Sequence, residues 1–237
     1  MKATVEQIQA RFDQDVERFS SLETGHTAIM DSLLLLDLLT RAAAAVTPQA
    51  VSLLDIGCGA GNYSLKMLSV ISDLHVTLLD LSQPMLERAQ ERIRPATRGS
   101  VTAFQADIRQ LPLEREQFDI ILAGAVFHHL RTDDEWQAVF RKCFLALKPG
   151  GALWIADMVE QATPSVQALM WSRYGEYLTD LRDEQYRDHV FAYIEGEDTP
   201  RSLIYQLDLL RAVGFAEVEV LHKNGCFAAF GGIRTGS

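Results

Sequence analysis

The stretch that decides the fold reads Val51-Ser52-Leu53-Leu54-Asp55-Ile56-Gly57-Cys58-Gly59-Ala60-Gly61-Asn62. Residues 51–56 are apolar enough for a strand that is buried on both faces, as in a parallel sheet, and a helical pattern begins at Asn62. Glycines on alternate positions join the two. Glycine lets the backbone adopt a positive φ and lets a ligand approach where a Cβ would block it, while a helix N-terminus offers unpaired N–H groups. The stretch therefore predicts a strand, a ligand-binding turn and a helix.

The spacing of the glycines separates two classes of ligand. A dinucleotide fingerprint, G-x-G-x-x-G, would need its third glycine at position 62, where this chain has asparagine. The order Asp-x-Gly-x-Gly-x-Gly from Asp55 to Gly61 instead resembles motif I of the class I S-adenosylmethionine-dependent methyltransferases. In that family the turn holds the amino-acid end of the cofactor. The resemblance implies that S-adenosyl-L-methionine contacts Asp55, Gly57, Cys58, Gly59 and Gly61.

A second strand pattern, over residues 75–80, ends in Asp80. A carboxylate at this position can accept hydrogen bonds from both ribose hydroxyls, and adenosine occurs in S-adenosylmethionine as well as in NAD. Asp80 therefore supports an adenosine ligand without choosing between the two. A helix-capping role for Asp80 is the weaker alternative, because Ser82 already stands where a cap is needed. Leu81 and Met85 are assigned to the same cofactor site.

A third strand pattern covers residues 101–106 and is followed directly by another acid. In the family that the chain resembles, an acid here bonds the adenine amino group and the next apolar side chain covers the ring. The resemblance implies the first role for Asp107 and the second for Ile108. A loop acid alone would be a weak signal, but Asp107 is the third acid in register with the strands.

The fourth strand pattern, over residues 118–123, leads into Gly124-Ala125-Val126-Phe127-His128-His129-Leu130. This turn resembles motif IV of small-molecule methyltransferases, which implies that Ala123, Phe127 and His128 lie at the cofactor. His128 and His129 are the candidate catalytic residues, because they are the titratable pair near the reacting end. Packing or cofactor contact is nevertheless favoured over proton abstraction, since the same turn occurs in relatives with unrelated acceptors. A general base is optional when in-line transfer depends on positioning.

Two helical patterns precede the core, one over residues 4–20 and one from about Thr27 or Asp31 to Ala45. In the resembling family, such helices often lie across the mouth of the cofactor site. Arg11 is the candidate substrate-binding residue of this segment, since it could reach the methionyl carboxylate or an acceptor. Solvated charge on an amphipathic helix is the favoured alternative.

Residues 158–198 occupy the place where such families insert acceptor-recognition segments. Their helical patterns are rich in aromatic residues, of which Trp171, Tyr174 and Tyr177 are the candidates for acceptor binding. The alternative is that these rings only fasten the inserted helices to the sheet. Nine acids and three arginines fall in the segment, which favours a solvated helical cap over a cation-selective pocket.

The C-terminal pattern completes the fold class. A helix is expected over residues 200–213, and two strands, 215–221 and 226–231, are joined across Asn224-Gly225 as a tight hairpin. The resemblance implies a Rossmann-like α/β methyltransferase sheet in the order 3-2-1-4-5-7-6, with the last strand antiparallel. The chain is then a single methyltransferase domain over 1–237, divided into an N-terminal helical cover (1–47), a cofactor-binding core (51–157), a helical insertion (158–198) and a final helix with a β-hairpin (199–237).

Composition limits the classes of function that remain. A length of 237 residues suits one large α/β domain. The net charge of −10 and the absence of clustered Lys and Arg disfavour a nucleic-acid partner. Three widely spaced cysteines show no metal-ligand spacing, so no metal is expected, and their odd number favours a reducing cytoplasm. Neither a signal peptide nor a membrane-spanning run is expected, so the protein is interpreted as soluble.

These patterns together predict an S-adenosylmethionine-dependent methyltransferase that acts on a small-molecule acceptor by in-line methyl transfer. The resemblance is to the ubiquinone and menaquinone-biosynthesis-like methyltransferase group. A non-catalytic regulator that binds the same cofactor would have the same sequence features. A nicotinamide-dependent oxidoreductase would share Asp80 but is less favoured, because the third dinucleotide glycine is missing. A monomer and a homodimer are both compatible with the sequence.

Overall fold

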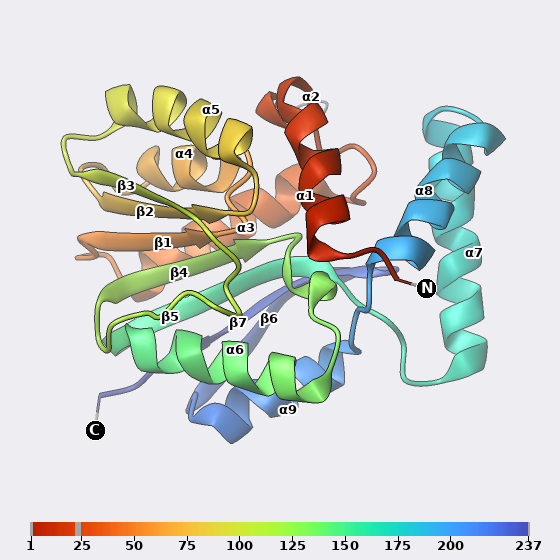
Figure 1. Cartoon of the computed structure of the whole chain (residues 1–237). Helices are drawn as coiled ribbons and strands as arrows, with labels where there is room; N and C mark the ends of the chain where they lie inside the picture. The colour runs from red at the N-terminus through yellow and green to blue at the C-terminus, as the bar shows by residue number, and fades with distance from the viewer. Residues whose placement is uncertain (1, 22–24, 237) are drawn as a thin grey trace.

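The computed structural model describes residues 2–21 and 25–236, in which seven strands form one sheet in the order β3-β2-β1-β4-β5-β7-β6 (Figure 1). Strands β1 to β5 pair in parallel, and β7 runs antiparallel to both β5 and β6. The predicted strand order and the antiparallel last strand are confirmed. The strands are β1 Ser52–Ile56, β2 His75–Asp80, β3 Val101–Gln105, β4 Phe118–Gly124, β5 Leu147–Met158, β6 Glu217–Asn224 and β7 Phe227–Ile233.

Helices cover both faces of this sheet (Figure 1). On one face lie α3 (Ser32–Val46), α4 (Asn62–Leu68) and α5 (Gln83–Ile93), and on the other α6 (Asp133–Ala146) and α9 (Leu203–Val213). Neighbouring residues of β1 point to opposite faces of the sheet. Leu53 packs in the core on the side of α3, α4 and α5, Leu54 packs in the core on the side of α6 and α9, and both are fully buried. Burial on both faces explains why the strand is a continuous apolar run.

The segment over residues 4–20 forms two helices, α1 (Val5–Gln14) and α2 (Val16–Ser20), so the prediction of one helix there was wrong. The break is at Asp15, whose φ of −102° and ψ of 11° leave the helical region. Thr4 starts α1 with a reciprocal capping box to Gln7, which satisfies two N–H groups that the helix leaves open. Residues 22–24, which fall between the two predicted helical patterns, lie outside the described part of the chain.

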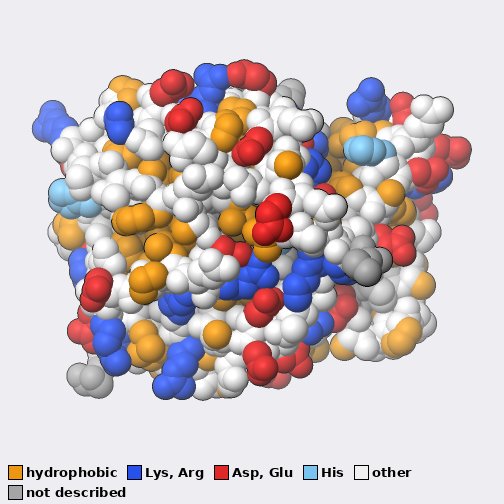
Figure 2. Space-filling view, viewed as in Figure 1, with side chains coloured by type: hydrophobic (Ala, Val, Ile, Leu, Met, Phe, Trp, Pro, Cys, Tyr) orange, Lys and Arg blue, Asp and Glu red, His pale blue; other side chains and the backbone are white. Residues whose placement is uncertain are grey.

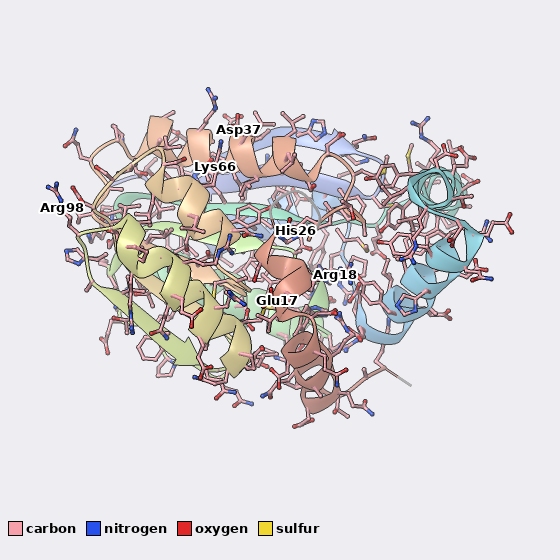
Figure 3. The ribbon with its side chains drawn as sticks, turned by 90° about the horizontal axis from the view of Figure 1, so that it is seen from above. Glu17, Arg18, His26, Asp37, Lys66 and Arg98 are labelled. Atoms are coloured by element: carbon pink, nitrogen blue, oxygen red, sulfur yellow. The ribbon has the colours of Figure 1, made fainter. Side chains whose placement is uncertain are left out.

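Helix α3 begins at Ser32 with Asp31 as its N-cap, so the earlier of the two predicted starts, Thr27, was wrong. Asp37 of α3 and Lys66 of α4 form an ion pair with a 2.8 Å N–O distance (Figure 3). This pair joins the two helices on their outer side.

Two further helices, α7 (Pro164–Leu181) and α8 (Glu184–Glu197), stand together at one side of the sheet next to α1 (Figure 1). Pro164 is the first residue of α7, a position where its missing N–H leaves no helical hydrogen bond unmade. The prediction that a second helix starts at Pro200 was wrong, since α9 begins at Leu203 and is capped by Ser202. Thr199, just before Pro200, does not cap a helix. Its N–H donates a hydrogen bond to the carbonyl of His128 at 2.7 Å. A short 3-10 helix, η1 (Arg94–Ala96), follows α5.

Hydrogen bonds to Asp119 join the amino ends of the central strands β1, β4 and β5. Its Oδ2 accepts hydrogen bonds from the N–H groups of Val51 and Ser52 at 3.0 and 2.9 Å, and Lys148 Nζ lies 2.9 Å away. The opposite, carboxyl edge of the same strands is where the glycine turn lies. The fold therefore directs attention to that edge, where parallel α/β sheets bind their ligands.

Candidate active site

A cavity opens at the carboxyl ends of β1, β2 and β4. The glycine turn after β1 and Asp80 at the end of β2 form one part of its wall, and side chains of α1 and α2 form another. Its lining residues are Ile8, Phe12, Phe19, His26, Ile56, Gly57, Cys58, Gly59, Ala60, Asn62, Tyr63, Leu79, Asp80, Leu81, Met85, Ala106, Asp107, Ile108, Arg109, Gly124, Ala125, Val126, His129 and Leu130.

The three glycines of the turn differ in what surrounds them. Gly57, Gly59 and Gly61 all have a positive φ, of 64°, 49° and 85°, which favours glycine at each position. A Cβ on Gly57 would lie 2.6 Å from Val126, and a Cβ on Gly61 would lie 2.7 Å from Ile93, so packing also closes these two positions. A Cβ on Gly59 would meet no atom within 4 Å. Gly59 therefore borders open space that a ligand at this turn can occupy.

Asp80 connects the end of β2 to the glycine turn. Its Oδ2 accepts a hydrogen bond from the N–H of Gly59 at 2.8 Å, and its Oδ1 accepts one from the N–H of Ser82 at 2.9 Å. Ser82 is the N-cap of α5, since its Oγ accepts a hydrogen bond from the N–H of Met85. Asp80 is therefore not needed as a helix cap, and it lines the cavity. Burial raises the pKa of Asp80, although the N–H donors of Ser82 and Gly59 oppose the shift. A carboxylate with two oxygens fixed at this wall fits the paired hydroxyls of a ribose.

Asp55 lies behind the turn and does not line the cavity. Its Oδ2 accepts hydrogen bonds from Ser64 Oγ at 2.6 Å and from the N–H of Ser64 at 3.2 Å. Asp55 is buried, with 1% of its surface exposed. Burial raises the pKa of Asp55 to about 7. The carboxyl group thus ties α4 to β1, and it holds the turn rather than touching the cavity.

Asp107 and Ile108, for which the resemblance implies contacts with adenine, both line the cavity. The carboxylate of Asp107 is engaged by Arg109, whose Nε lies 3.0 and 2.9 Å from its two oxygens. Burial opposes ionisation, but Arg109 outweighs it and lowers the pKa of Asp107. Arg109 also bonds Glu135 at 3.1 Å, so this wall is a fixed ionic chain between the β3 loop and α6.

The turn after β4 contains a second 3-10 helix, η2 (Phe127–His129), which is organised by Asp157 at the end of β5. Asp157 Oδ2 accepts from the N–H groups of Phe127 and His128, and its Oδ1 makes a short contact with His128 Nδ1. Burial disfavours the charged imidazole, but Asp157 and Asp198 outweigh it and raise the pKa of His128 to about 9. His128 lies behind the cavity wall and is 7% exposed.

His129, unlike His128, lines the cavity. Its Nδ1 is 3.2 Å from Oδ1 of Asp198, which follows α8, but the contact does not have hydrogen-bond geometry. Burial and the neighbouring His128 lower the pKa of His129, so its imidazole is neutral at pH 7. Phe12 of α1 packs edge-on against the same ring at 6.1 Å. Sequence reasoning missed Asp198, which stands far along the chain from both histidines.

Helices α1 and α2 close one side of the cavity with aromatic side chains. Phe12 and Phe19 pack on each other with ring centroids 5.7 Å apart, and Phe19 also packs on His26. Figure 3 places His26 next to α2 and beside Arg18. Burial, with Arg18 adding to it, lowers the pKa of His26 to about 4. Asn62, at the start of α4, donates to the carbonyl of Phe19 at 2.9 Å and so joins this cover to the glycine turn.

Arg11 does not reach the cavity. Its guanidinium donates to both carboxylate oxygens of Glu197 at 2.8 and 2.6 Å, and it lies over the rings of Phe12 and Tyr193. The predicted contact with a ligand is therefore replaced by a bidentate bridge from α1 to the end of α8.

Trp171, Tyr174 and Tyr177 are also placed away from the cavity. Tyr174 is 1% exposed, and its hydroxyl donates to the carbonyl of Ala28 at 3.0 Å, while Tyr177 donates to the carbonyl of Thr27 at 2.6 Å. Trp171 stacks on Phe191 of α8 at 4.5 Å. These rings fasten α7 and α8 to each other and to the segment before α3, which is the alternative that the sequence left open.

Some of the residues that were predicted to contact the cofactor or to act in catalysis line the cavity, and others do not. Gly57, Cys58, Gly59, Asp80, Leu81, Met85, Asp107, Ile108 and His129 line it, whereas Asp55, Gly61, Ala123, Phe127 and His128 lie behind the lining. The residues that sequence reasoning missed include Ile8, Phe12 and Phe19, which the helical periodicity of residues 4–20 had already put on one apolar face.

Comparisons with known proteins agree with this geometry. Residues 53–151 match a family model described as a methyltransferase domain. The chain is 26% identical over 184 residues to a demethylmenaquinone methyltransferase of Lactococcus lactis, covering 76% of this chain and 71% of that protein. It is 34% identical over 114 residues to a 27-O-demethylrifamycin SV methyltransferase of Amycolatopsis mediterranei, covering 48% of this chain and 40% of that protein.

A solved structure has the same fold. Human N-acetylserotonin methyltransferase in complex with SAM superposes with a TM-score of 0.62 at 16% identity, covering 97% of this chain and 57% of that one. In addition, none of the described helices is both long and apolar enough to cross a membrane. On the face shown in Figure 2, acidic and basic side chains are intermixed.

Proposed function

We propose that this chain is a class I S-adenosylmethionine-dependent methyltransferase whose acceptor is a small, largely apolar molecule held between the glycine turn and helices α1 and α2. The observation that carries the proposal is the continuity of one cavity. The same space borders Gly59 and Asp80 at one side and Phe12 and Phe19 at the other. A methyl donor and its acceptor must share such a space, because the transfer is direct.

We assign the cofactor to the part of the cavity formed by the ends of β1, β2 and β3. S-adenosylmethionine supplies the sulfonium methyl group when it is bound. The open space at Gly59 fits its approach to the backbone, and Asp80 offers acceptor oxygens for the ribose. Met85 and Ile108 supply apolar surface on which the adenine ring can pack.

We assign the acceptor to the part of the cavity formed by α1, α2 and the turn after β4. Ile8, Phe12, Phe19, Val126 and Leu130 make this part apolar. An apolar wall both binds an apolar acceptor and keeps water from the sulfonium. His128 and His129 act by position in this proposal, since His128 lies behind the wall and His129 is packed on Phe12.

The same proposal covers the organisation of the chain. Residues 1–237 work as one catalytic domain, in which α1 and α2 cover the site and α7 and α8 support that cover through Arg11 and Glu197. The three cysteines are buried and free, in keeping with a cytoplasmic location and with no role in the chemistry. The mixture of charge signs in Figure 2 supports a partner other than nucleic acid.

The experiment has two steps, which separate cofactor binding from turnover. Calorimetry with S-adenosylhomocysteine measures binding at the glycine turn, and we expect a saturable site. Methyl-labelled cofactor is then supplied with demethylmenaquinone, with 27-O-demethylrifamycin SV and with a fractionated metabolite extract. Labelled product from any of these is the expected result. Tight cofactor binding with no labelled product from any acceptor would favour a regulator instead.

A further inference from the structure

Three side-chain atoms from two distant segments converge next to the cavity. His128 Nε2 and His129 Nδ1 come from η2, and Asp198 Oδ1 follows the last residue of α8. The oxygen is 3.7 Å from the first nitrogen and 3.2 Å from the second, and the candidate ligand atoms lie within 4.8 Å of one another. Such a cluster joins two imidazoles and a carboxylate, a set of donors that transition-metal ions favour.

The carboxylate of Asp198 has no hydrogen-bond donor of its own among the described residues. Its side chain is 0% exposed, and neither oxygen accepts a hydrogen bond, nor does His129 Nδ1 have a hydrogen-bond partner there. Buried polar atoms are nearly always paired, because an unpaired one loses its hydrogen bonds to water without replacement, and the cost is greater for a charged group. Two of these unpaired atoms, His129 Nδ1 and Asp198 Oδ1, lie 3.2 Å apart.

The charges of the cluster point the same way. Asp157 and Asp198 bring two carboxylates into it, and both side chains are 0% exposed. Arg11, the nearest arginine of α1, is committed to Glu197, and Lys2 donates to the main-chain oxygens of Glu195 and Asp198. A divalent cation with two neutral imidazoles would balance both carboxylates.

The spacing suits a small ion. Donor atoms at 2.0–2.1 Å from a tetrahedral zinc ion lie about 3.3 Å from one another. The two distances to Asp198 Oδ1, 3.2 and 3.7 Å, bracket that value. The remaining nitrogen of His128 is held by Asp157, which leaves Nε2 as the donor. A carboxylate behind a metal-binding imidazole is the usual way in which proteins fix its ring.

We propose that His128, His129 and Asp198 form a binding site for a divalent transition-metal ion, with zinc as the first candidate, and that Asp157 orients His128 within it. No metal site was expected from the sequence, because these ligands do not have metal-motif spacing along the chain. Three protein ligands leave a further coordination position for water or another oxygen donor. Because His129 lines the cavity, the ion would lie at its wall.

The test uses the full chain, freed of metal with a chelator and dialysed, and it needs no methyltransferase activity. Zinc chloride is added, unbound metal is removed, and zinc per chain is measured by mass spectrometry. We expect one zinc ion per chain. The Asp198→Asn and His129→Gln variants should bind zinc at least about a hundredfold more weakly, and Asp157→Asn about 10- to 100-fold more weakly.

The matched control is His189→Gln, which removes an exposed histidine from α8 and should bind zinc as the original chain does. Should the buried variants fail to fold, cobalt chloride added to the original chain gives an independent measurement, because tetrahedral cobalt absorbs strongly in the visible region. Equal zinc binding by the original chain and a folded Asp198→Asn variant would overturn the proposal. So would a cobalt spectrum identical to that of the free ion.

Discussion

The glycine turn and the histidine turn follow neighbouring parallel strands, yet they are built in different ways. Residues 57–61 offer a backbone with positive φ at three glycines and open space at Gly59, and all of them come from one continuous stretch. The histidine turn depends on side chains, because His128 is bonded to Asp157 of β5 and His129 lies beside Asp198 beyond α8. A site made of backbone can be read from local sequence. A site made of side chains needs the tertiary fold before its members can be known.

The largest effect is expected from closing the open space of the glycine turn. Gly59→Val should abolish binding of S-adenosylhomocysteine, because a branched side chain would occupy the only turn position where a Cβ meets no protein atom within 4 Å and would resist its φ of 49°. Calorimetry measures the affinity for S-adenosylhomocysteine, and the loss of melting temperature measures the backbone strain that the substitution adds.

The control for this variant is Gly150→Val. Gly150 also has a positive φ, of 84°, and its Cβ would also meet nothing within 4 Å, but it does not line the cavity. Both variants carry the same kind of backbone strain, so a similar loss of melting temperature is expected. Retained binding by a folded Gly59→Val protein would remove the turn from the site.

A second test asks whether the glycine turn also depends on a hidden side chain. Burial raises the pKa of Asp55 to about 7 in the folded chain, so the folded state binds its proton more tightly than the unfolded state does. The stability that this provides is complete below the unfolded pKa of about 4 and is lost as the pH rises through about 7. A shift of this size corresponds to about 4 kcal/mol between pH 4 and pH 8.

Urea unfolding across that pH range should therefore show a fall in stability that the Asp55→Asn variant lacks. Asp119→Asn gives a comparison of opposite sign, because contacts with Ser52 and Lys148 outweigh burial and lower the pKa of Asp119. Its contribution is present above the unfolded pKa and is lost as the pH falls. Parallel pH profiles for Asp55→Asn and the original chain would contradict the proposed role of Asp55.

The third prediction concerns the two acids that line the cavity. Asp80→Ala should weaken binding of S-adenosylhomocysteine by about 1.5–3 kcal/mol, the scale of hydrogen bonds to a charged group. Asp107→Ala should cost less, because its carboxylate is already engaged by Arg109. Calorimetry on both variants, with NAD as a competitor, measures the difference. An equal loss in both, or competition by NAD at comparable affinity, would count against the assignment of the ribose to Asp80.

Much of the fold could be predicted from the sequence, because its information is local. Apolar runs, acids and glycines placed the strands along the chain, and the family resemblance that these motifs carry implied the strand order, which the structure has. The break at Asp15 was missed, since the apolar period continues across it. Thr199-Pro200 was misread as a helix start because the main chain there is used to bond His128. Aromatic residues of α7 carry no local mark that tells a packed ring from a pocket wall, and the partnership of Asp198 with His129 needs the fold.

The smallest expected effect distinguishes a residue of α1 that lines the cavity from a residue of α7 that only packs behind it. Phe12 of α1 lines the cavity, whereas Tyr174 of α7 is buried away from it and donates a hydrogen bond to Ala28. Phe12→Ala should raise the acceptor KM about tenfold, or about 1.4 kcal/mol, with little change in cofactor affinity. Tyr174→Phe keeps the ring and removes only one hydrogen bond, so it should cost about 0.5–1.5 kcal/mol of stability and leave KM unchanged. Measuring melting temperature and KM on both variants decides between the two roles. A raised KM in Tyr174→Phe would return the aromatic segment to the acceptor site, and an unchanged KM in Phe12→Ala would remove α1 from it.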